Sequence, residues 1–320
     1  MKTPVRLTSL LALILIAICG FSGSARADDG ASSISAGGIV SFKREPRITM
    51  AKEVLRIEGK ITVDYDFRND TDEDVTTLVA FPIPAYSPDG MHDHHEPAEV
   101  KFDDFSLWIN NAPAKYKTQA RAFVNGKDLT ALLEKMHVDV ANFGHTDEGE
   151  GSPEIQKLTD AQRERLERAG LIECDGAHNC GTLWEVHKEY YWLQTFPAHS
   201  TTHIRHAYTP VGGYYASGGP DDPAAFCVNR KLKETLRKAA MEGGYSSSSS
   251  WVNFILTSAN TWKTPIEDFT LIVEGNPEHM SFCWDGPVEK IDAAHVMARA
   301  VNFVPKRELA IVYYSLRKLE

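Results

Sequence analysis

The sequence contains one dense cluster of side chains that could bind a metal ion. Residues 91–96 read Met-His-Asp-His-His-Glu and follow a Pro-Asp-Gly turn at 88–90. Imidazole and carboxylate groups bind zinc, copper or nickel. Neighbouring residues on one loop seldom form a closed site, because the ion also needs a distant ligand. A solvated loop is the simpler interpretation; if a metal is bound here, we expect His92, His94 and His95 to bind zinc or copper.

Four cysteines lie beyond residue 27: Cys174, Cys180, Cys227 and Cys283. An even number in an oxidising compartment indicates two disulfides, and four cysteines allow three pairings. Cys174 and Cys180 flank a turn-rich segment that can close a small loop, which leaves Cys227 and Cys283 to join distant segments. A zinc site of Cys174, His178 and Cys180 is the alternative, but it lacks an obvious fourth ligand. We predict the disulfides Cys174–Cys180 and Cys227–Cys283.

Aromatic residues at 190–192 (Tyr-Tyr-Trp) offer a second kind of candidate site. Exposed aromatic rings on a β-sandwich can stack against sugars or a partner protein, which makes Tyr191 and Trp192 candidate binding residues. The alternative is that these rings pack in the core of alternating strands.

Catalytic patterns find little support in the sequence. There is no Gly-x-Ser-x-Gly motif, and the adjacent carboxylates at 103–104 and 221–222 fall in predicted loops. His203 and His206 are separated by an odd number of positions, so a strand would point them to opposite faces. The sequence therefore favours a protein that is not an enzyme and has no cofactor.

The elements that position these residues are mostly strands. Alternation at 61–68 and again at 75–81 predicts an antiparallel hairpin across the polar turn 69–74. A second hairpin is predicted from 186–196 and 202–208. We predict helices over 128–135, 159–169 and 229–241, the second with a capping box of Thr159 and Gln162. Ser246–Ser250 is low in complexity and is predicted to be a loop.

These patterns predict a mainly β protein with two antiparallel β-sandwich units. The first unit spans residues 28–124 and the second, β-rich unit spans 183–320. Residues 125–182 form a helical and loop insertion between them.

Residues 1–27 have the features of a signal peptide. Lys2 and Arg6 are followed by an apolar run, Leu7–Ile18, that is too short to span a bilayer. Ala25 and Ala27 suit signal peptidase, so we expect the mature chain to begin at residue 28. A lipoprotein anchored at Cys19 and an uncleaved N-terminal anchor are the alternatives. The expected location is periplasmic or secreted, with no transmembrane segment in the mature chain.

The mature chain is acidic. Removing residues 1–27 lowers Lys plus Arg from 34 to 31 and leaves Asp plus Glu at 44, so the net charge moves from -10 to -13. The electrostatic field of such a negative charge repels nucleic acid and anionic lipid. The simpler interpretation is that an acidic surface keeps the protein soluble. The expected partner is a periplasmic protein or a glycan of unknown identity, and not nucleic acid.

Several motifs resemble the DUF4424 family of exported bacterial proteins of unknown function. The motifs are Asp-Asp-Gly at 28–30 with Ala-Gly-Gly at 36–38, Tyr-Asp-Phe-Arg-Asn at 65–69 leading to Val-Ala-Phe-Pro-Ile-Pro at 79–84, and Tyr-Trp at 191–192 with Phe-Pro-Ala at 196–198 and His-Ala-Tyr-Thr-Pro at 206–210. With later matches they cover nearly the whole mature chain. The family brings no known activity, so the resemblance assigns no functional residue.

Two functions follow as hypotheses. A non-catalytic periplasmic binding or adaptor protein is favoured, because strands, aromatic residues and cysteine pairs are present without a catalytic constellation. The alternative is a metal-dependent hydrolase or metal carrier built around His92, His94 and His95.

Overall fold

The computed structural model describes residues 29–34, 40–88, 96–97, 104–141, 157–174, 180–210 and 212–319. Strands make up 51% and helices 14%, so the predicted mainly β class is confirmed. The predicted signal peptide lies outside the described residues. Within the described ranges, no helix is both long and apolar enough to cross a bilayer.

The largest sheet has eight strands in the order β19-β20-β17-β3-β4-β14-β7-β8. Their bounds are Val288–Lys290, His295–Phe303, Ile266–Glu274, Ile48–Ile57, Ile61–Asn69, Ser200–Tyr208, Ser106–Ile109 and Ala112–Pro113. The pairs are antiparallel except β17 with β3, which are parallel.

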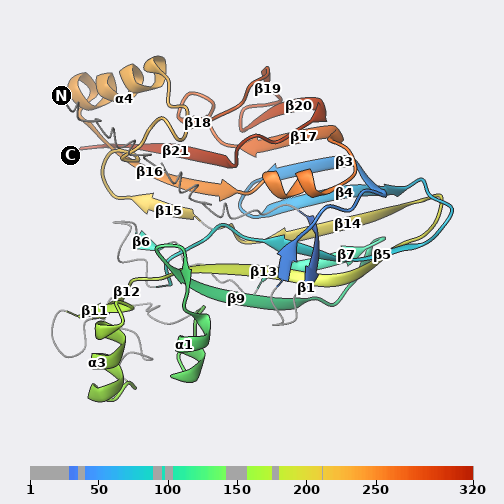
Figure 1. Cartoon of the computed structure of the whole chain (residues 1–320). Helices are drawn as coiled ribbons and strands as arrows, with labels where there is room; N and C mark the ends of the chain where they lie inside the picture. Colours follow the sequence, from blue (N-terminus) through green and yellow to red (C-terminus); the bar gives the residue numbers. More distant parts are fainter. Residues whose placement is uncertain are drawn as a thin grey trace, which may run out of the picture.

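A six-stranded sheet lies against it, in the order β10-β9-β13-β5-β1-β2 (Figure 1). Its strands are Lys127–Asp128, Lys117–Val124, Glu185–Phe196, Val75–Pro82, Gly30–Ile34 and Val40–Phe42. Aromatic rings meet between the two sheets: Phe67 and Phe196 have centroids 5.6 Å apart, and Phe105 and Tyr190 have centroids 4.0 Å apart. The two sheets therefore enclose one apolar core, as in a sandwich.

Both predicted hairpins are wrong, although the alternation that predicted these strands does mark one buried face on each. Strands β4 and β5 do not pair with each other; β4 pairs with β14, and β5 pairs with β13. The turns 70–74 and 197–199 each carry the chain from one sheet to the other. Alternation identifies the buried face of a strand but not its neighbour, so two strands that face each other across a core look like a hairpin.

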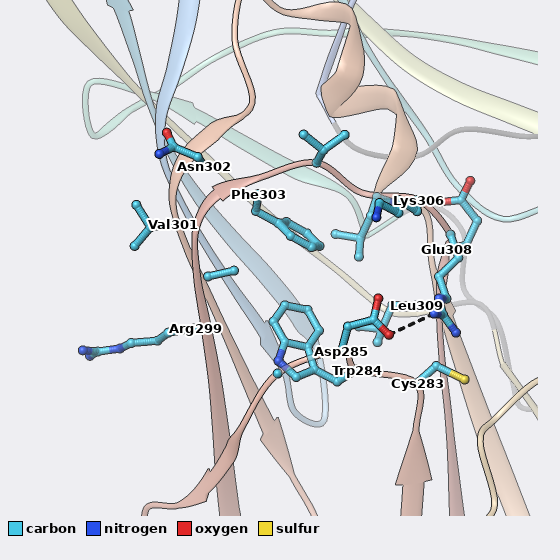
Figure 2. A pocket seen from close by; sticks show the side chains of 15 residues that line it. Cys283, Trp284, Asp285, Arg299, Val301, Asn302, Phe303, Lys306, Glu308 and Leu309 are labelled. Carbon is cyan, nitrogen blue, oxygen red and sulfur yellow. Dashed lines mark hydrogen bonds and ion pairs between the residues drawn. The ribbon is translucent and has the colours of Figure 1, made fainter.

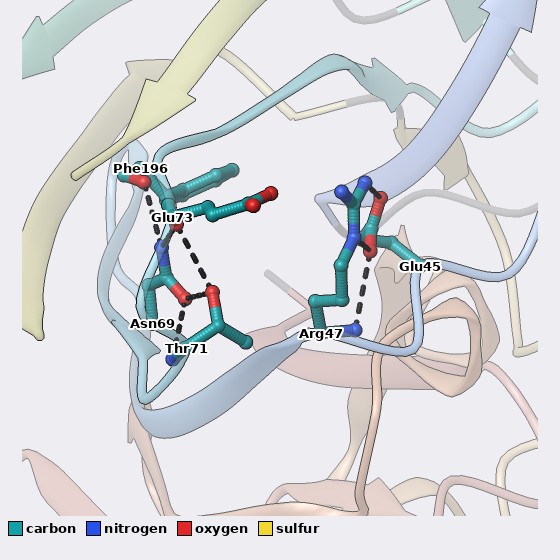
Figure 3. A network of polar contacts seen from close by, with 6 residues as sticks. All are labelled: Glu45, Arg47, Asn69, Thr71, Glu73 and Phe196. Carbon is teal, nitrogen blue, oxygen red and sulfur yellow. Dashed lines mark hydrogen bonds and ion pairs between the residues drawn. The ribbon is translucent and has the colours of Figure 1, made fainter. Parts of the chain in front are cut away.

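Asn69, fully buried at the end of β4, connects these two turns (Figure 3). Its Nδ2 donates to the carbonyl oxygens of Glu73 and Phe196, both at 2.9 Å. Its Oδ1 accepts from the backbone N of Thr71 at 3.0 Å and from Thr71 Oγ1 at 2.7 Å. One amide therefore satisfies backbone groups in both connections and holds that end of the sandwich together.

A five-stranded sheet has the order β18-β21-β16-β15-β6. Its strands are Met280–Phe282, Leu309–Lys318, Tyr245–Phe254, Gly212–Tyr215 and Glu96–Pro97. The prediction of a loop at Ser246–Ser250 is wrong, because these serines lie in β16 and pair with β21 over its whole length. The backbone partners of these serines come from β21, which is distant in sequence. The low complexity of a segment does not show whether a distant strand will pair with it.

Helices occupy the predicted places. Helix α1 spans Thr130–Lys135 and α3 spans Asp160–Arg168, with the predicted capping box of Thr159 and Gln162. Helix α4 (Arg230–Gly243) is capped by Asn229, whose Oδ1 accepts from the backbone N of Leu232 at 2.9 Å. In Figure 1, α1 and α3 lie below the sheets and α4 lies above them.

The segments 28–124 and 183–320, predicted as two units, contribute strands to the same two sheets. Strand β13 pairs with both β5 and β9, and β17 pairs with β3. A single cluster of buried apolar residues includes members of both segments. The insertion 125–182 holds β10, α1, α3 and the small pair β11 (Ile172–Cys174) and β12 (Cys180–Thr182). The boundary at 125–182 therefore does not separate the sheets.

Candidate functional site

A cavity of about 420 Å³ opens beside the turn that joins β20 to β21 (Figure 2). Its walls are the end of β20, the segment 304–308, the start of β21 and the segment 283–286 that follows β18. Ligand pockets measure about 300–1,000 Å³. The cavity is therefore large enough for a small molecule.

Packed aromatic rings form one wall of this cavity. The ring centroids of Trp284 and Phe303 are 5.3 Å apart, and both rings pack on Phe269, at 5.7 and 4.7 Å. Phe269 is fully buried, so the core supports the wall from behind. The Nε1 atom of Trp284 is shielded from solvent and has no hydrogen-bond partner among the described residues. A Cβ added at Gly286 would lie 3.0 Å from that nitrogen, so the glycine backbone packs closely against the indole N–H.

The bridge Cys227–Cys283, with a sulfur–sulfur distance of 2.02 Å, positions Trp284. It joins the residue before Trp284 to a turn that precedes α4. Ser281 strengthens the same connection, since its Oγ donates to the carbonyl oxygen of Cys227 at 3.0 Å. The aromatic wall is therefore attached to two parts of the chain that are 56 positions apart in sequence.

The charged groups around the cavity are unequally engaged. Asp285 forms an ion pair with Arg307 at 3.0 Å. The carboxylate of Glu308 accepts from the backbone N of Leu256 at 2.7 Å and from Thr257 Oγ1 at 2.6 Å. In the described part of the chain, the lining residues Arg299 and Lys306 form no ion pair.

A second hollow of about 790 Å³ lies on the other side of the same turn and shares residues 306–309 with the first. Phe226 and Phe254 contribute apolar surface to it. Asn260 holds the turn between the hollows, because its Nδ2 donates to the carbonyl oxygen of Pro305 at 2.9 Å.

A buried polar pair lies elsewhere, inside the sandwich. His206 and Asp29 are both completely buried, and Nε2 of His206 is 3.4 Å from Oδ1 of Asp29. Aromatic rings surround the imidazole, the nearest being Phe81 with its centroid at 4.8 Å. Burial lowers the pKa of His206 to about 3. Neither side chain can meet a substrate, so we assign this pair to the stability of the fold.

The structure also contains the disulfide Cys174–Cys180, at 2.02 Å, which links β11 to β12. Because the two sulfurs are bonded to each other, neither is a thiolate, and the alternative zinc site at these cysteines is not supported. His92, His94 and His95 lie outside the described residues, so their metal binding stays a prediction. Among the residues that the structure describes, no group of three or more His, Cys, Asp or Glu side chains could hold a metal ion.

The aromatic pair predicted to bind does not form one surface. Trp192 is only 5% exposed and its ring packs against His206, with centroids 5.4 Å apart. Tyr191 is half-buried on the opposite face of β13. The rings that do line a cavity, Trp284 and Phe303, are 19 positions apart and share no motif. The one sequence feature that could have pointed to this cavity is that Trp284 directly follows Cys283, which is predicted to form a disulfide.

The sequence model of a domain of unknown function, DUF4424, matches residues 27–312. The chain belongs to the DUF4424 family. None of the curated protein sequences matches this DUF4424 protein.

Two solved structures show weak similarity to this DUF4424 chain. One is a "putative nutrient binding protein" from Legionella pneumophila, with 16% identity and a TM-score of 0.42, covering 91% of this chain and 73% of that protein. The other is an M1 zinc metallopeptidase from Deinococcus radiodurans, with 10% identity and a TM-score of 0.30, covering 85% of this chain and 43% of the enzyme. At these TM-scores neither likeness carries an argument about function.

Proposed function

We propose that this DUF4424 protein is a non-catalytic binding protein of the periplasm that holds a small molecule in the cavity beside the β20–β21 turn. The observation that carries this proposal is the ring pair of Trp284 and Phe303, which offers aromatic surface inside a cavity of about 420 Å³. Binding sites combine such apolar walls with a few polar groups.

The chemistry of the cavity favours binding over catalysis. Both lining carboxylates are already engaged, Asp285 with Arg307 and Glu308 with the backbone that follows β16. The lining cysteine, Cys283, is in a disulfide and cannot act as a nucleophile. Among the described lining residues, this leaves no acid–base pair for a reaction.

The periplasmic location rests on the signal-peptide pattern of residues 1–27 together with the two disulfides, which persist in oxidising compartments. Protein from an osmotic-shock fraction should begin at residue 28 when its N-terminus is sequenced. A chain that begins at Met1 in the membrane fraction would contradict the location.

The binding function can be tested by thermal stability. Sugars, amino acids, nucleosides and organic acids would be added to wild type and to Trp284→Ala, with Leu193→Ala as a control whose residue is 71% exposed on another sheet. A ligand that binds only the folded state raises Tm in a concentration-dependent way. We expect at least one compound to stabilise wild type and Leu193→Ala but not Trp284→Ala. Equal shifts in all three proteins would contradict the proposed site.

A further inference from the structure

We propose that the cavity binds a short peptide in an extended conformation, which adds a strand to the open edge of β20. This inference rests on the proposed function, because it names the ligand class of the same cavity. The peptide continues the sheet in line with β19. Its backbone bonds to β20, and one apolar side chain points toward the rings of Trp284 and Phe303.

Strand β20 has a long neighbour on one side and a short neighbour on the other. Strand β17 pairs with it as far as Phe303, whereas β19 pairs with it only as far as Ala298. In the register of β19, the next residue would be Pro287, opposite Arg299. Proline has no N–H to donate, so the ladder of hydrogen bonds stops there. Beyond Ala298, no strand in the described part of the chain pairs with this edge of β20.

The backbone groups of Arg299 and Val301 point toward this open edge. The carbonyl oxygen of His295 accepts from the backbone N of Ile291 at 3.0 Å, which places the polar groups of His295 on the side of β19. In an antiparallel strand, the N–H and C=O of one residue face the same neighbour, and every second residue faces that side. The register between β20 and β17 is regular from His295 to Val301. The N–H and C=O of Arg299 and Val301 therefore face the side where β19 has ended, and the backbone of an added strand matches them.

The cavity follows the edge of β20 and not one of its faces. Residues 299–304 all line it, one after another. Successive side chains of a strand point to opposite faces, so a pocket on one face would be lined by every second residue only. The segment 283–286, which leads into β19, lines the same cavity. The space therefore lies where the next stretch of a neighbouring strand would run.

The two faces of this edge differ, which determines the side chains that a peptide should carry. In Figure 2, Arg299 and Val301 point away from the rings of Trp284 and Phe303. Val301 is 76% exposed, whereas Ala300 is partly buried and packs against the core. A peptide residue opposite Ala300 would thus place its side chain on the face of the rings, and the residues before and after it would face solvent. We expect an apolar central residue between two polar residues.

Methylation of the peptide backbone tests the added strand. The parent probe is acetyl-Thr-Leu-Thr-amide, and its binding to wild type would be measured by isothermal titration calorimetry. The N–H groups of both threonines should face β20, so methylation of these two nitrogens should weaken binding about tenfold. The N–H of the leucine should point away from β20, so methylation of that nitrogen should leave the affinity unchanged. Equal affinity of all three peptides, or an equal loss in both methylated forms, would overturn the inference.

Two variants at one position test the same hydrogen bonds from the side of the protein. Val301→Pro removes an N–H that faces the open edge and leaves the bonds to β17 in place, and an edge strand tolerates such a proline. It should weaken binding of the parent peptide about tenfold. Val301→Thr keeps both the N–H and the branched shape, so it should bind as wild type does. Circular dichroism would verify that each variant is folded; if Val301→Pro is not, the methylated peptides on wild type still decide.

The two proposals fail in different ways. If a small molecule stabilises wild type through Trp284 but the parent peptide does not bind, the peptide inference is overturned while ligand binding at the cavity survives. If Trp284→Ala changes the response to neither small molecules nor the peptide, both proposals lose their site. A wild-type dimer that Val301→Pro separates in analytical ultracentrifugation would show that a second copy occupies the edge, and it would also overturn the peptide inference.

Discussion

Nε2 of His206 lies 3.4 Å from Oδ1 of Asp29 in the centre of the sandwich, and neither side chain is exposed to solvent. The contact joins β14 to the residue just before β1. Trp262 fixes the same position, because its Nε1 donates to the carbonyl oxygen of Asp29. The first described residue of the chain is therefore part of the core and not a loose end.

Acid should destabilise the protein through His206. Burial lowers the pKa of this imidazole from 6.5 to about 3. Between these pH values the unfolded chain binds a proton that the folded chain does not, so the free energy of unfolding falls as pH falls. In calorimetry from pH 7 to pH 4, His206→Gln should show a flatter dependence of Tm on pH. His199→Gln, at an exposed histidine, should keep the wild-type slope, and identical slopes in all three proteins would rule out this role.

Glu189 should have the opposite pH dependence. Burial raises the pKa of its carboxyl from 4.5 to about 7. The stability that Glu189 contributes is present below pH 4.5 and is lost as pH rises through 7, because the folded state must then release its proton. Glu189→Gln should raise Tm at pH 8 and have little effect at pH 4.5. Glu185→Gln, on the same strand with a side chain 71% exposed, is the control; a similar gain there would argue against the burial effect.

The bridge Cys227–Cys283 should matter for both stability and binding. Loss of a native disulfide typically costs about 2–5 kcal/mol, and a longer closed loop gives the larger effect. Cys227→Ser/Cys283→Ser should therefore lower the free energy of unfolding and also reduce the rise in Tm that a ligand of the cavity produces, because the bridge positions Trp284. Cys174→Ser/Cys180→Ser opens a loop of only six positions and should leave the ligand-induced rise in Tm unchanged. Non-reducing peptide mapping checks both pairings, and a crossed pairing would contradict them.

Asn69→Ala should destabilise the protein by about 2–3 kcal/mol, since buried backbone carbonyls would lose their donor. The free energy of unfolding can be measured by urea denaturation. Asp72→Ala is a matched control in the same turn. Its exposed contact with His199 should contribute less than about 1 kcal/mol. Equal losses for the two variants would show that the buried amide has no special role.

The histidine loop remains testable without a structure. Zinc and copper would be titrated by calorimetry into wild type and into the triple variant His92→Ala/His94→Ala/His95→Ala. Imidazole must be neutral to bind a metal, so any affinity should weaken below about pH 6.5. Equal heats for the two proteins at neutral pH would remove the loop from consideration as a metal site.

Local signals in the sequence predicted local features well. The capping box of Thr159 and Gln162 formed as expected, because both partners lie within one turn of helix. Alternation also identified the buried faces of β4 and β5. It could not identify their partners, because pairing depends on strands that lie far away in sequence. The same limit hid the cavity, since Trp284 and Phe303 lie 19 positions apart in sequence and share no motif, although their rings meet in the folded chain.

The pairing of the central strands limits how early this chain can fold during its synthesis. Leu78 of β5 pairs with Leu193 of β13, and Tyr65 of β4 pairs with Ile204 of β14. β4 also pairs with the early strand β3, and β5 with β1, but the other neighbour of each strand is synthesised much later. Until then each early strand has an open edge that can associate with other chains. Pairing between such distant strands is also slow. A newly made chain cannot complete the pairing of β4 and β5 until residues near 208 have emerged.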